Sequence, residues 1–393
     1  MIKPPTSNIQ HLTLLMLTRK VDRADTSPAG FTYNWVKKLG ERLDKLYVIT
    51  WQKSDRSNLP ENIKIISLSG NKFKKIFTLQ KELLKILPKV DGIFCHQNPE
   101  YTILCGILAK IYRKKIISWY THKQVSWKLH LVNLLADKIL TASKESCRLK
   151  NRKKIVVTGH GIDIEKFKPL SFHRKEPPSL SPPSSRGEIE GGEKFIILSV
   201  GRISPVKDYE TLIEAIEILT KHTISSIFSL PGRKESLFSG KGKEAILVQI
   251  IGAPALDKDK KYFEKLKNLV KRKKLENCIK FLGPIPHNQI LPYYQNCDLF
   301  INLSQTGSVD KAVLEAMACE KLVITCNEAF VNILNDKKLL FEPKNPRNLA
   351  QKIINLMNLS NEEKEKINYS LRREVIKNHN LNKLIEKILL CFS

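Results

Sequence analysis

Residues 195–209 read FIILSVGRISPVKDY, and this stretch decides the fold class. The apolar run Phe195–Val200 is typical of a buried strand. Gly201 begins a turn, and Asp208 is a favourable N-cap for the amphipathic helix pattern that follows. A strand that leads through a turn into a helix is the repeating unit of parallel α/β sheets, in which sites form at the carboxyl ends of strands.

The same alternation extends in both directions along the chain. Toward the N-terminus, helix patterns such as Phe31–Arg42, Leu79–Leu87 and Thr102–Ile111 separate short apolar runs. These runs are Leu12–Leu17, Leu46–Trp51, Ile63–Leu68, Gly92–Cys95, Lys115–Trp119, Lys138–Ala142 and Ile155–Thr158. Further strands are expected at Ala245–Ile251, Cys278–Leu282, Leu299–Leu303, Leu322–Thr325 and Leu339–Phe341, before a helical end. The sequence therefore predicts two Rossmann-like, doubly wound α/β domains that face a central cleft.

Breaks in this pattern mark the domain boundaries. Residues 176–192 are rich in Pro and Ser and have no periodicity, so we interpret them as part of an exposed linker or insertion. Segment Thr220–Lys243 is interpreted as a second polar insertion, and both are expected to be tolerated additions. The predicted organisation is an N-terminal domain at 1–168, the linker at 169–193, a C-terminal domain at 194–370, and a C-terminal helix at 371–393 that packs back toward the N-terminal domain.

Composition limits the class of protein. The 393 residues are 42% apolar and 27% charged, which is typical of a soluble globular chain with two domains. No apolar run approaches the ~20 residues that cross a bilayer, and His11–Leu17 lacks a signal-peptide cleavage site, so we expect a cytoplasmic protein. The eight cysteines form no Cys-x-x-Cys pair and predict neither disulfides nor a zinc site.

The formal net charge of +28 has two interpretations. It reflects either a general enrichment in Lys, which is spread along the chain, or a functional basic face for an anionic partner. No nucleic-acid-binding motif is present, so a nucleic-acid partner is not expected.

Arg202 and Lys207 flank the turn at the end of the Phe195–Val200 strand. A helix N-terminus attracts anions, and two cations directed at the same space would clamp a diphosphate. The alternative is that both are solvated surface cations.

A second segment, NLSQTGSVDKAVLEAMA at residues 302–318, repeats the pattern of strand, small-residue loop and apolar helix. Glu315 stands among apolar residues, and a buried carboxylate needs a hydrogen-bond partner. Ribose hydroxyls would satisfy it, and so would a neighbouring loop of the protein. Gly307 and Ser308 offer backbone N–H groups at the helix start, which favours an anion there.

These segments, in this order, resemble glycosyltransferase family 4, a group of retaining enzymes with the GT-B fold. The resemblance is carried by Val-Gly-Arg-x4-Lys ending at Lys207 and by Leu-Glu-Ala-Met-Ala around Glu315. Residues 157–167, 279–283 and 293–300 match other family elements in the expected order. The match covers nearly the whole chain except the two insertions.

The resemblance implies a role for each matching residue. Arg202 and Lys207 would hold the diphosphate of the donor, and Glu315 would bind its ribose. Gly30 matches a glycine loop that faces the donor phosphates and the acceptor. His122 matches a histidine on the acceptor side of the cleft, although a lone histidine is more often structural.

One departure from the family concerns the donor sugar. The family places two glutamates eight positions apart, and Gly307 stands where the first is expected before Glu315. Asp310 is a candidate substitute at a different place on the helix. His160 stands where asparagine is usual in the interdomain turn.

We therefore expect a retaining glycosyltransferase that moves a sugar from a nucleotide-diphosphate sugar to a hydroxyl acceptor, with no metal or other cofactor. The basic charge suggests a lipid-linked or cell-envelope acceptor and peripheral binding to the inner face of the cytoplasmic membrane. The alternatives are a non-catalytic nucleotide-sugar-binding protein, a GT-B epimerase or a phosphorylase.

Overall fold

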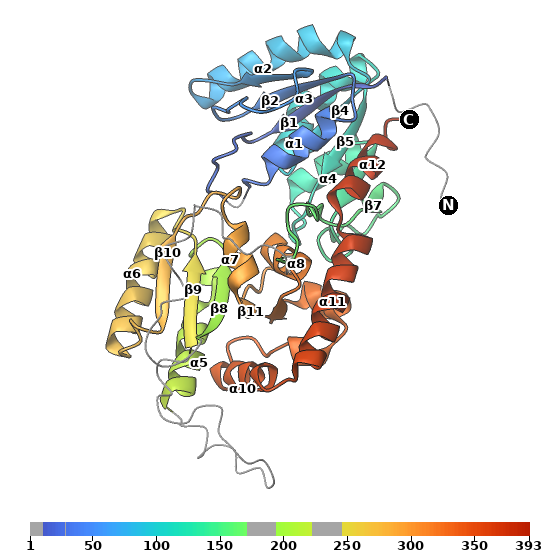
Figure 1. Ribbon diagram of the computed structural model, residues 1–393. Coiled ribbons are helices and arrows are strands. Elements are labelled where there is room, and N and C mark those ends of the chain that lie inside the picture. Colours follow the sequence, from blue (N-terminus) through green and yellow to red (C-terminus); the bar gives the residue numbers. More distant parts are fainter. Residues whose placement is uncertain (1–10, 28, 171–193, 222–245) are drawn as a thin grey trace.

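The computed structural model describes residues 11–27, 29–170, 194–221 and 246–393, which form two α/β domains (Figure 1). The predicted linker at 169–193 and the predicted insertion Thr220–Lys243 lie almost wholly outside these residues. Each domain is built on its own parallel sheet, so the predicted fold class is confirmed.

The N-terminal domain contains a seven-stranded sheet with the order β3-β2-β1-β4-β5-β6-β7. Neighbouring strands all pair in parallel. Strands that are buried on both faces read as continuous apolar runs, which is why these were visible in the sequence. The strands are β1 (Thr13–Thr18), β2 (Lys45–Thr50), β3 (Ile63–Ser67), β4 (Gly92–His96), β5 (Lys115–Trp119), β6 (Lys138–Thr141) and β7 (Ile155–Val157).

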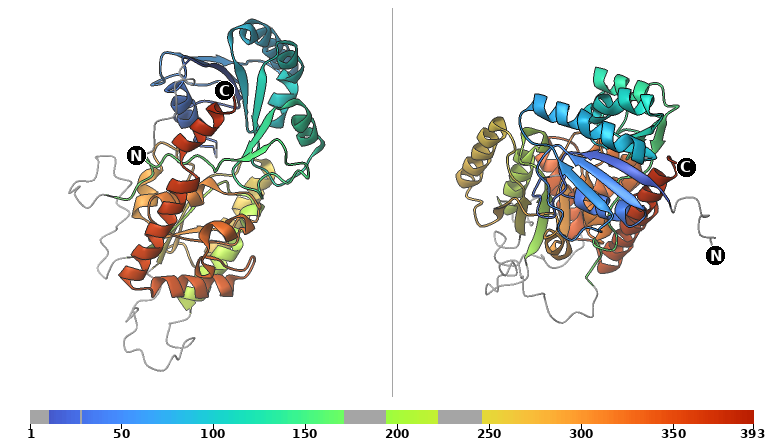
Figure 2. Two further views of the ribbon diagram at one scale, coloured as in Figure 1. Left: turned by 90° about the vertical axis from the view of Figure 1, so that its right-hand side faces the viewer. Right: turned by 90° about the horizontal axis from the view of Figure 1, so that it is seen from above.

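Helices cover both faces of this sheet (Figure 2). Trp35 of α1 and Leu384 of α12 pack on one face in a cluster that includes Met16. Leu83 of α2 and Val132 of α4 belong to the cluster on the other face. The bounds are α1 (Thr32–Gly40), α2 (Lys72–Ile86), α3 (Pro99–Ile111), α4 (Trp127–Leu135) and α12 (Leu381–Leu389), with a short helix η1 (Leu87–Lys89).

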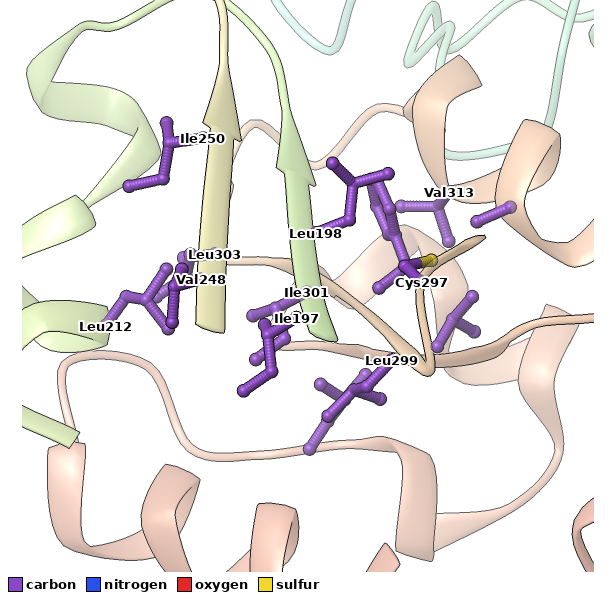
Figure 3. Packing of buried hydrophobic residues seen from close by; sticks show 14 of the residues in the cluster. Ile197, Leu198, Leu212, Val248, Ile250, Cys297, Leu299, Ile301, Leu303 and Val313 are labelled. Carbon is purple, nitrogen blue, oxygen red and sulfur yellow. The ribbon is translucent and has the colours of Figure 1, made fainter. Parts of the chain in front are cut away.

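The C-terminal domain contains a five-stranded sheet with the order β10-β9-β8-β11-β12, the same pattern as the first five strands of the other domain. Ile197, Val248 and Ile301 lie in the middle of its apolar core (Figure 3). The strands are β8 (Phe195–Val200), β9 (Ile246–Ile251), β10 (Ile279–Gly283), β11 (Leu299–Asn302) and β12 (Leu322–Thr325). The helices are η2 (Pro205–Lys207), α5 (Tyr209–Lys221), α6 (Asp257–Arg272), α7 (Leu291–Asn296), α8 (Lys311–Ala318), η3 (Glu328–Phe330), α9 (Val331–Leu334), η4 (Lys337–Leu339), α10 (Pro346–Met357) and α11 (Asn361–Asn378).

The strand expected at Leu339–Phe341 is not formed. Asp336 accepts a hydrogen bond from the N–H of Lys338 at 2.8 Å and starts the turn η4 there. A single bridge between Thr325 and Leu340 is what remains of the expected pairing. A local side-chain cap has replaced the ladder hydrogen bonds of a sixth strand.

Two chain segments cross between the domains side by side. Ile162 donates its N–H to the carbonyl of His379 at 2.6 Å, and Leu381 donates to the carbonyl of Ile162 at 2.9 Å. Gly159 has a φ of +82°, and a Cβ there would lie 1.7 Å from the carbonyl oxygen of Asn378. Because α11 contributes to the C-terminal core and α12 to the N-terminal core, we propose that the domain boundary lies between these two helices.

Candidate functional site

The two segments singled out in the sequence meet at one edge of the C-terminal sheet. The strand order reverses between β8 and β11, which are paired neighbours. Arg202 follows the carboxyl end of β8, and Gly307 and Asp310 follow that of β11. In open α/β sheets this reversal point is where a crevice forms and ligands bind. The structure therefore brings most of the predicted donor residues to one place.

Lys207 is held by a carboxylate across this crevice. Its Nζ lies 3.2 Å from Oδ1 of Asp310, the residue that precedes α8. Asp310 in turn accepts a hydrogen bond from the amide of Asn302 at 3.1 Å, and Asn302 accepts one from Thr325 at 3.1 Å. The short helix η2 ends at Lys207, and Asp208 takes the left-handed conformation before α5 begins. This network fixes a cation beside the N-terminus of α8.

Arg202 is less constrained than Lys207. Its side chain is about half exposed, and its Nε lies 3.8 Å from Oδ2 of Asp259. That carboxylate is buried at the start of α6, where it caps the helix by accepting from the N–H of Leu256. The guanidinium is therefore attracted toward Asp259 without being locked by it, and it keeps further N–H donors.

Gly307 has a backbone conformation that disfavours other residues. Its φ is +63°, and a Cβ there would lie 2.5 Å from Oε1 of Glu328 and 2.9 Å from Cδ of Lys123. Glu328 pairs with Arg148 of the N-terminal domain at 2.7 Å. The carbonyl of the next residue, Ser308, accepts a hydrogen bond from Asn327. The first glutamate of the family is expected at position 307. Here the neighbouring carboxylate belongs to Glu328, which comes from another loop.

Glu315 is bonded within the protein, as one of the two alternatives predicted. Its carboxylate accepts from the hydroxyl of Tyr294 at 2.8 Å, and Nε2 of His287 lies 2.8 Å from the other oxygen. Burial by itself raises the pKa of Glu315, but His287 and Lys311 outweigh burial and lower it overall. The carboxylate therefore stays ionised, and each oxygen keeps a further acceptor site.

Gly30 lets the loop after β1 pack against His287, the partner of Glu315. A Cβ on Gly30 would lie 2.5 Å from the carbonyl oxygen of Asp25 and 3.0 Å from Cβ of His287. The loop therefore approaches the C-terminal domain more closely than another residue would allow. His287 is the residue that joins Gly30 to Glu315, and the sequence analysis missed it.

His122 lies apart from these groups. Its ring is exposed, and its Nδ1 accepts a hydrogen bond from the N–H of Gln124 at 3.1 Å. The neighbouring Lys123 is the residue that reaches the C-terminal domain, with its Nζ 3.3 Å from the carbonyl oxygen of Gln305. The structure thus places His122 at the cleft side of the N-terminal domain without a contact to Glu315 or Lys207.

Lys311 is a second residue that the sequence analysis did not single out. It lies one helical turn before Glu315, and its Nζ is 3.4 Å from the centre of the Phe31 ring and 3.2 Å from the carbonyl oxygen of Gly161. Burial lowers the pKa of Lys311 to about 7, although Glu315 acts in the opposite direction. The signal in the sequence was the spacing of four residues between two opposite charges.

Over the described ranges 11–27, 29–170, 194–221 and 246–393, no group of three or more His, Cys, Asp or Glu side chains is arranged to hold an ion.

Residues 184–374 match the family described as Glycosyl transferases group 1. No curated protein sequence matches the chain.

Solved structures with the same fold span both domains. HepE of Anabaena in complex with UDP has a TM-score of 0.70 at 16% identity, covering 96% of this chain and 98% of that one. A glycosyltransferase from Rickettsia africae has a TM-score of 0.70 at 22% identity, with 97% of each chain covered. Sucrose-phosphate synthase from Thermosynechococcus elongatus has a TM-score of 0.68 at 14% identity, with 96% and 97% covered.

The likeness to these structures establishes the fold, and the family match covers the C-terminal domain with its donor-site segments. Residues 184–374 therefore belong to the group 1 glycosyltransferases, also called family 4, and the whole chain has the GT-B fold.

Proposed function

We propose that this enzyme transfers a sugar from a UDP-sugar to a hydroxyl group of a lipid-linked or other cell-envelope acceptor. The observation that carries the donor assignment is the pair Arg202 and Lys207 at the reversal point of the C-terminal sheet. HepE of Anabaena, which has the same fold, was solved with UDP and with UDP-glucose, and this favours uridine as the nucleotide.

The two cations supply the electrostatics of bond cleavage. When the bond between sugar and diphosphate breaks, negative charge develops on the leaving diphosphate. Lys207, fixed by Asp310, and the N-terminus of α8 next to Ser308 are in position before this charge appears. Arg202, near the other end of the turn, is assigned to the same diphosphate. Groups that are preorganised in this way stabilise the transition state more than the bound donor.

The ribose is assigned to Glu315. The carboxylate already accepts hydrogen bonds from Tyr294 and His287, and these bonds hold it in one orientation. The second lone pair of each oxygen is available to a ribose hydroxyl. Gly30 would then bring the loop after β1 over the bound donor, and His122 would lie on the acceptor side.

The carboxylate for the donor sugar is assigned to Glu328. Asp310, the substitute suggested by the sequence, already bonds Lys207 and Asn302. Oε1 of Glu328 lies within 2.5 Å of the position that a Cβ on Gly307 would take. Besides its ion pair with Arg148, which leaves further acceptor sites on the carboxylate, Glu328 would accept from sugar hydroxyls where the family's first glutamate is absent.

The acceptor class is inferred from charge. The chain carries a formal net charge of +28, and anionic lipid surfaces attract basic proteins. Among the helices described, none is long and apolar enough to span a bilayer. We therefore propose peripheral association with the inner face of the cytoplasmic membrane, where lipid-linked acceptors are found.

Product analysis tests this function directly. The purified enzyme is incubated with UDP-sugars, with and without a membrane extract that contains lipid acceptors. We expect release of UDP that depends on the extract, together with a glycosylated lipid whose new linkage keeps the configuration of the donor. Conversion of the donor without any acceptor would favour an epimerase, and UDP-sugar binding without turnover would favour a non-catalytic protein.

A further inference from the structure

One helical layer of the N-terminal domain has an unusual outer surface. Helices α2, α3 and α4 cover one face of the seven-stranded sheet, with α3 packed between α2 and α4. Each helix buries an inner stripe, which includes Leu83 of α2, Cys105 of α3 and Val132 of α4. Figure 1 shows α2 at the end of the molecule that lies farthest from the C-terminal domain. The outer side of this layer faces solvent.

The outer side carries the most exposed apolar residues in the described part of the chain. Six large apolar side chains are 67–83% exposed, whereas no other large apolar residue described exceeds 60%. All six belong to these helices: Phe73 and Phe77 of α2, Ile107 and Ile111 of α3, and Trp127 and Leu134 of α4. Single exposed apolar residues are normal, but this concentration on one layer marks an interaction surface.

The apolar residues of α2 are aligned. At about 100° per residue, Phe73, Phe77 and Leu84 fall within about 40° of one another around the helix axis. The buried residues Leu79 and Leu83 lie about 100–140° away from the middle of this outer stripe. Helix α2 thus has two separate apolar stripes, and only one of them packs on the core.

Lysines border the outer stripe. Helix α2 carries Lys72, Lys74, Lys75, Lys81 and Lys85 against one acidic residue, Glu82. Glu82 pairs with Lys85, whereas Lys72, Lys74 and Lys81 are exposed and have no ion pair among the residues described. Aromatic and aliphatic side chains flanked by lysines are the composition of helices that lie in the interface of anionic bilayers.

The same surface ends beside the cleft. Trp127 begins α4, only four residues after Lys123, whose Nζ contacts the carbonyl of Gln305 in the C-terminal domain. A bilayer against this layer would therefore lie close to the opening between the domains. A second copy of the chain is a poorer partner, because a symmetric contact would place the lysines of α2 against one another.

We propose that the outer surface of α2, α3 and α4 docks on an anionic bilayer, with Phe73, Phe77 and Trp127 in the lipid interface. This inference rests on the proposed function, in which the enzyme associates with the membrane, and it identifies the surface that contacts the lipid. The two proposals fail separately, because vesicle binding is measured without a donor and donor binding is measured without vesicles.

Cosedimentation of the full chain with vesicles tests the docking surface. Vesicles of phosphatidylcholine with 30% phosphatidylglycerol are compared with pure phosphatidylcholine, each at roughly 50 and 500 mM salt. We expect binding to the anionic vesicles that weakens with salt. The double variant Phe73→Ser/Phe77→Ser should lose at least about tenfold in partition coefficient, and Lys74→Gln or Lys81→Gln roughly fivefold each.

The matched control is Tyr369→Ser, which removes an exposed aromatic residue from α11 and should leave vesicle binding unchanged. Thermal stabilisation by UDP should also be unchanged in the double variant, which shows that its fold is intact. Equal vesicle binding by the double variant and the wild type would overturn the proposal. A concentration-dependent dimer that disappears in Phe73→Ser/Phe77→Ser, with no vesicle binding, would assign the surface to a second copy instead.

Discussion

The two sides of the cleft are built differently. On the C-terminal side, polar groups bond to one another, as Lys207 does to Asp310 and Tyr294 to Glu315. On the N-terminal side, aromatic rings pack together, with the ring centres of Trp35 and Trp119 5.0 Å apart. Four buried side-chain nitrogens on this side have no hydrogen-bond partner among the described residues. They are Trp35 Nε1, His96 Nε2, Trp119 Nε1 and His160 Nδ1.

This difference shows how the protein distributes charge. The C-terminal side keeps ionised groups paired and oriented, which suits the binding of a charged nucleotide. The N-terminal side keeps its buried histidines neutral, because burial lowers the pKa of His96 to about 3 and also lowers the pKa of His160. Lys311 crosses from the first side to the second and lies over Phe31. Charge recognition is thus concentrated on the C-terminal side.

The largest expected effect comes from removing a cation on the C-terminal side. Arg202→Ala should lower kcat/KM by roughly 100- to 1,000-fold, because a charge that faces the leaving diphosphate is lost. Steady-state kinetics with a UDP-sugar measures it. The matched control is Arg272→Ala at the far end of α6, which should retain wild-type activity. Near-normal turnover of Arg202→Ala would remove this residue from the site.

The next effect concerns the buried carboxylate of the same side. Glu315→Ala leaves Tyr294 and His287 without their acceptor and should lower the free energy of unfolding by about 3 kcal/mol. Chemical denaturation measures this loss. The exposed Glu264→Ala should change stability by less than about 0.5 kcal/mol. An unchanged stability of Glu315→Ala would show that the network does not hold the fold together.

The buried histidine in the segment that crosses between the domains, His379, should make stability fall in acid. Burial, helped by Lys387, lowers the pKa of His379 from 6.5 to about 4. A lowered pKa stabilises the fold above 6.5, and this contribution is lost as the pH falls toward 4, because the unfolded chain takes up the proton first. The slope for this histidine is about 1.4 kcal/mol per pH unit.

The variant His379→Asn isolates this contribution, because its amide oxygen can replace Nδ1 as the acceptor for the N–H of His160. Unfolding free energies of both proteins are measured by urea denaturation between pH 7 and pH 4. We expect a flatter pH dependence for the variant. Parallel curves for the two proteins would contradict a buried neutral His379.

The smallest effect tests the donor-sugar carboxylate. Glu328→Gln should raise KM for the UDP-sugar roughly three- to tenfold, since an exposed hydrogen bond and its charge are weakened. The affinity for UDP itself should not change, because the nucleotide does not reach this residue. Glu342→Gln, another exposed carboxylate, serves as the control. A loss of UDP affinity in Glu328→Gln would show that the residue acts on the nucleotide or on the domain contact with Arg148.

Local patterns explain what the sequence predicted well. Strands buried on both faces must be apolar throughout, so Phe195–Val200 and its counterparts were visible without any long-range information. Helix α2 began earlier than its apolar pattern at Leu79–Leu87 suggested, because Asn71 caps it by accepting from the N–H of Lys74 at 2.9 Å. The turn at Asp336 likewise replaced an expected strand. Local capping decided both differences.

Long-range contacts explain what the sequence did not predict. Nothing near Glu315 in the chain identified His287 as its partner, because the two are 28 residues apart and His287 lies in the loop between β10 and α7. Likewise, nothing near Gly307 in the chain indicated that Glu328, from another loop, lies beside this position. Residues can be assigned to strand ends from sequence, but their partners across the crevice need the fold.

The central claim is that the C-terminal side of the cleft holds the nucleotide, and calorimetric titration with UDP tests it most directly. The wild type is compared with Arg202→Ala on that side and His122→Ala on the N-terminal side. We predict that the wild type and His122→Ala bind UDP with similar affinity and that Arg202→Ala loses most of it. Equal affinity in Arg202→Ala, or no UDP binding by the folded wild type, would contradict the account.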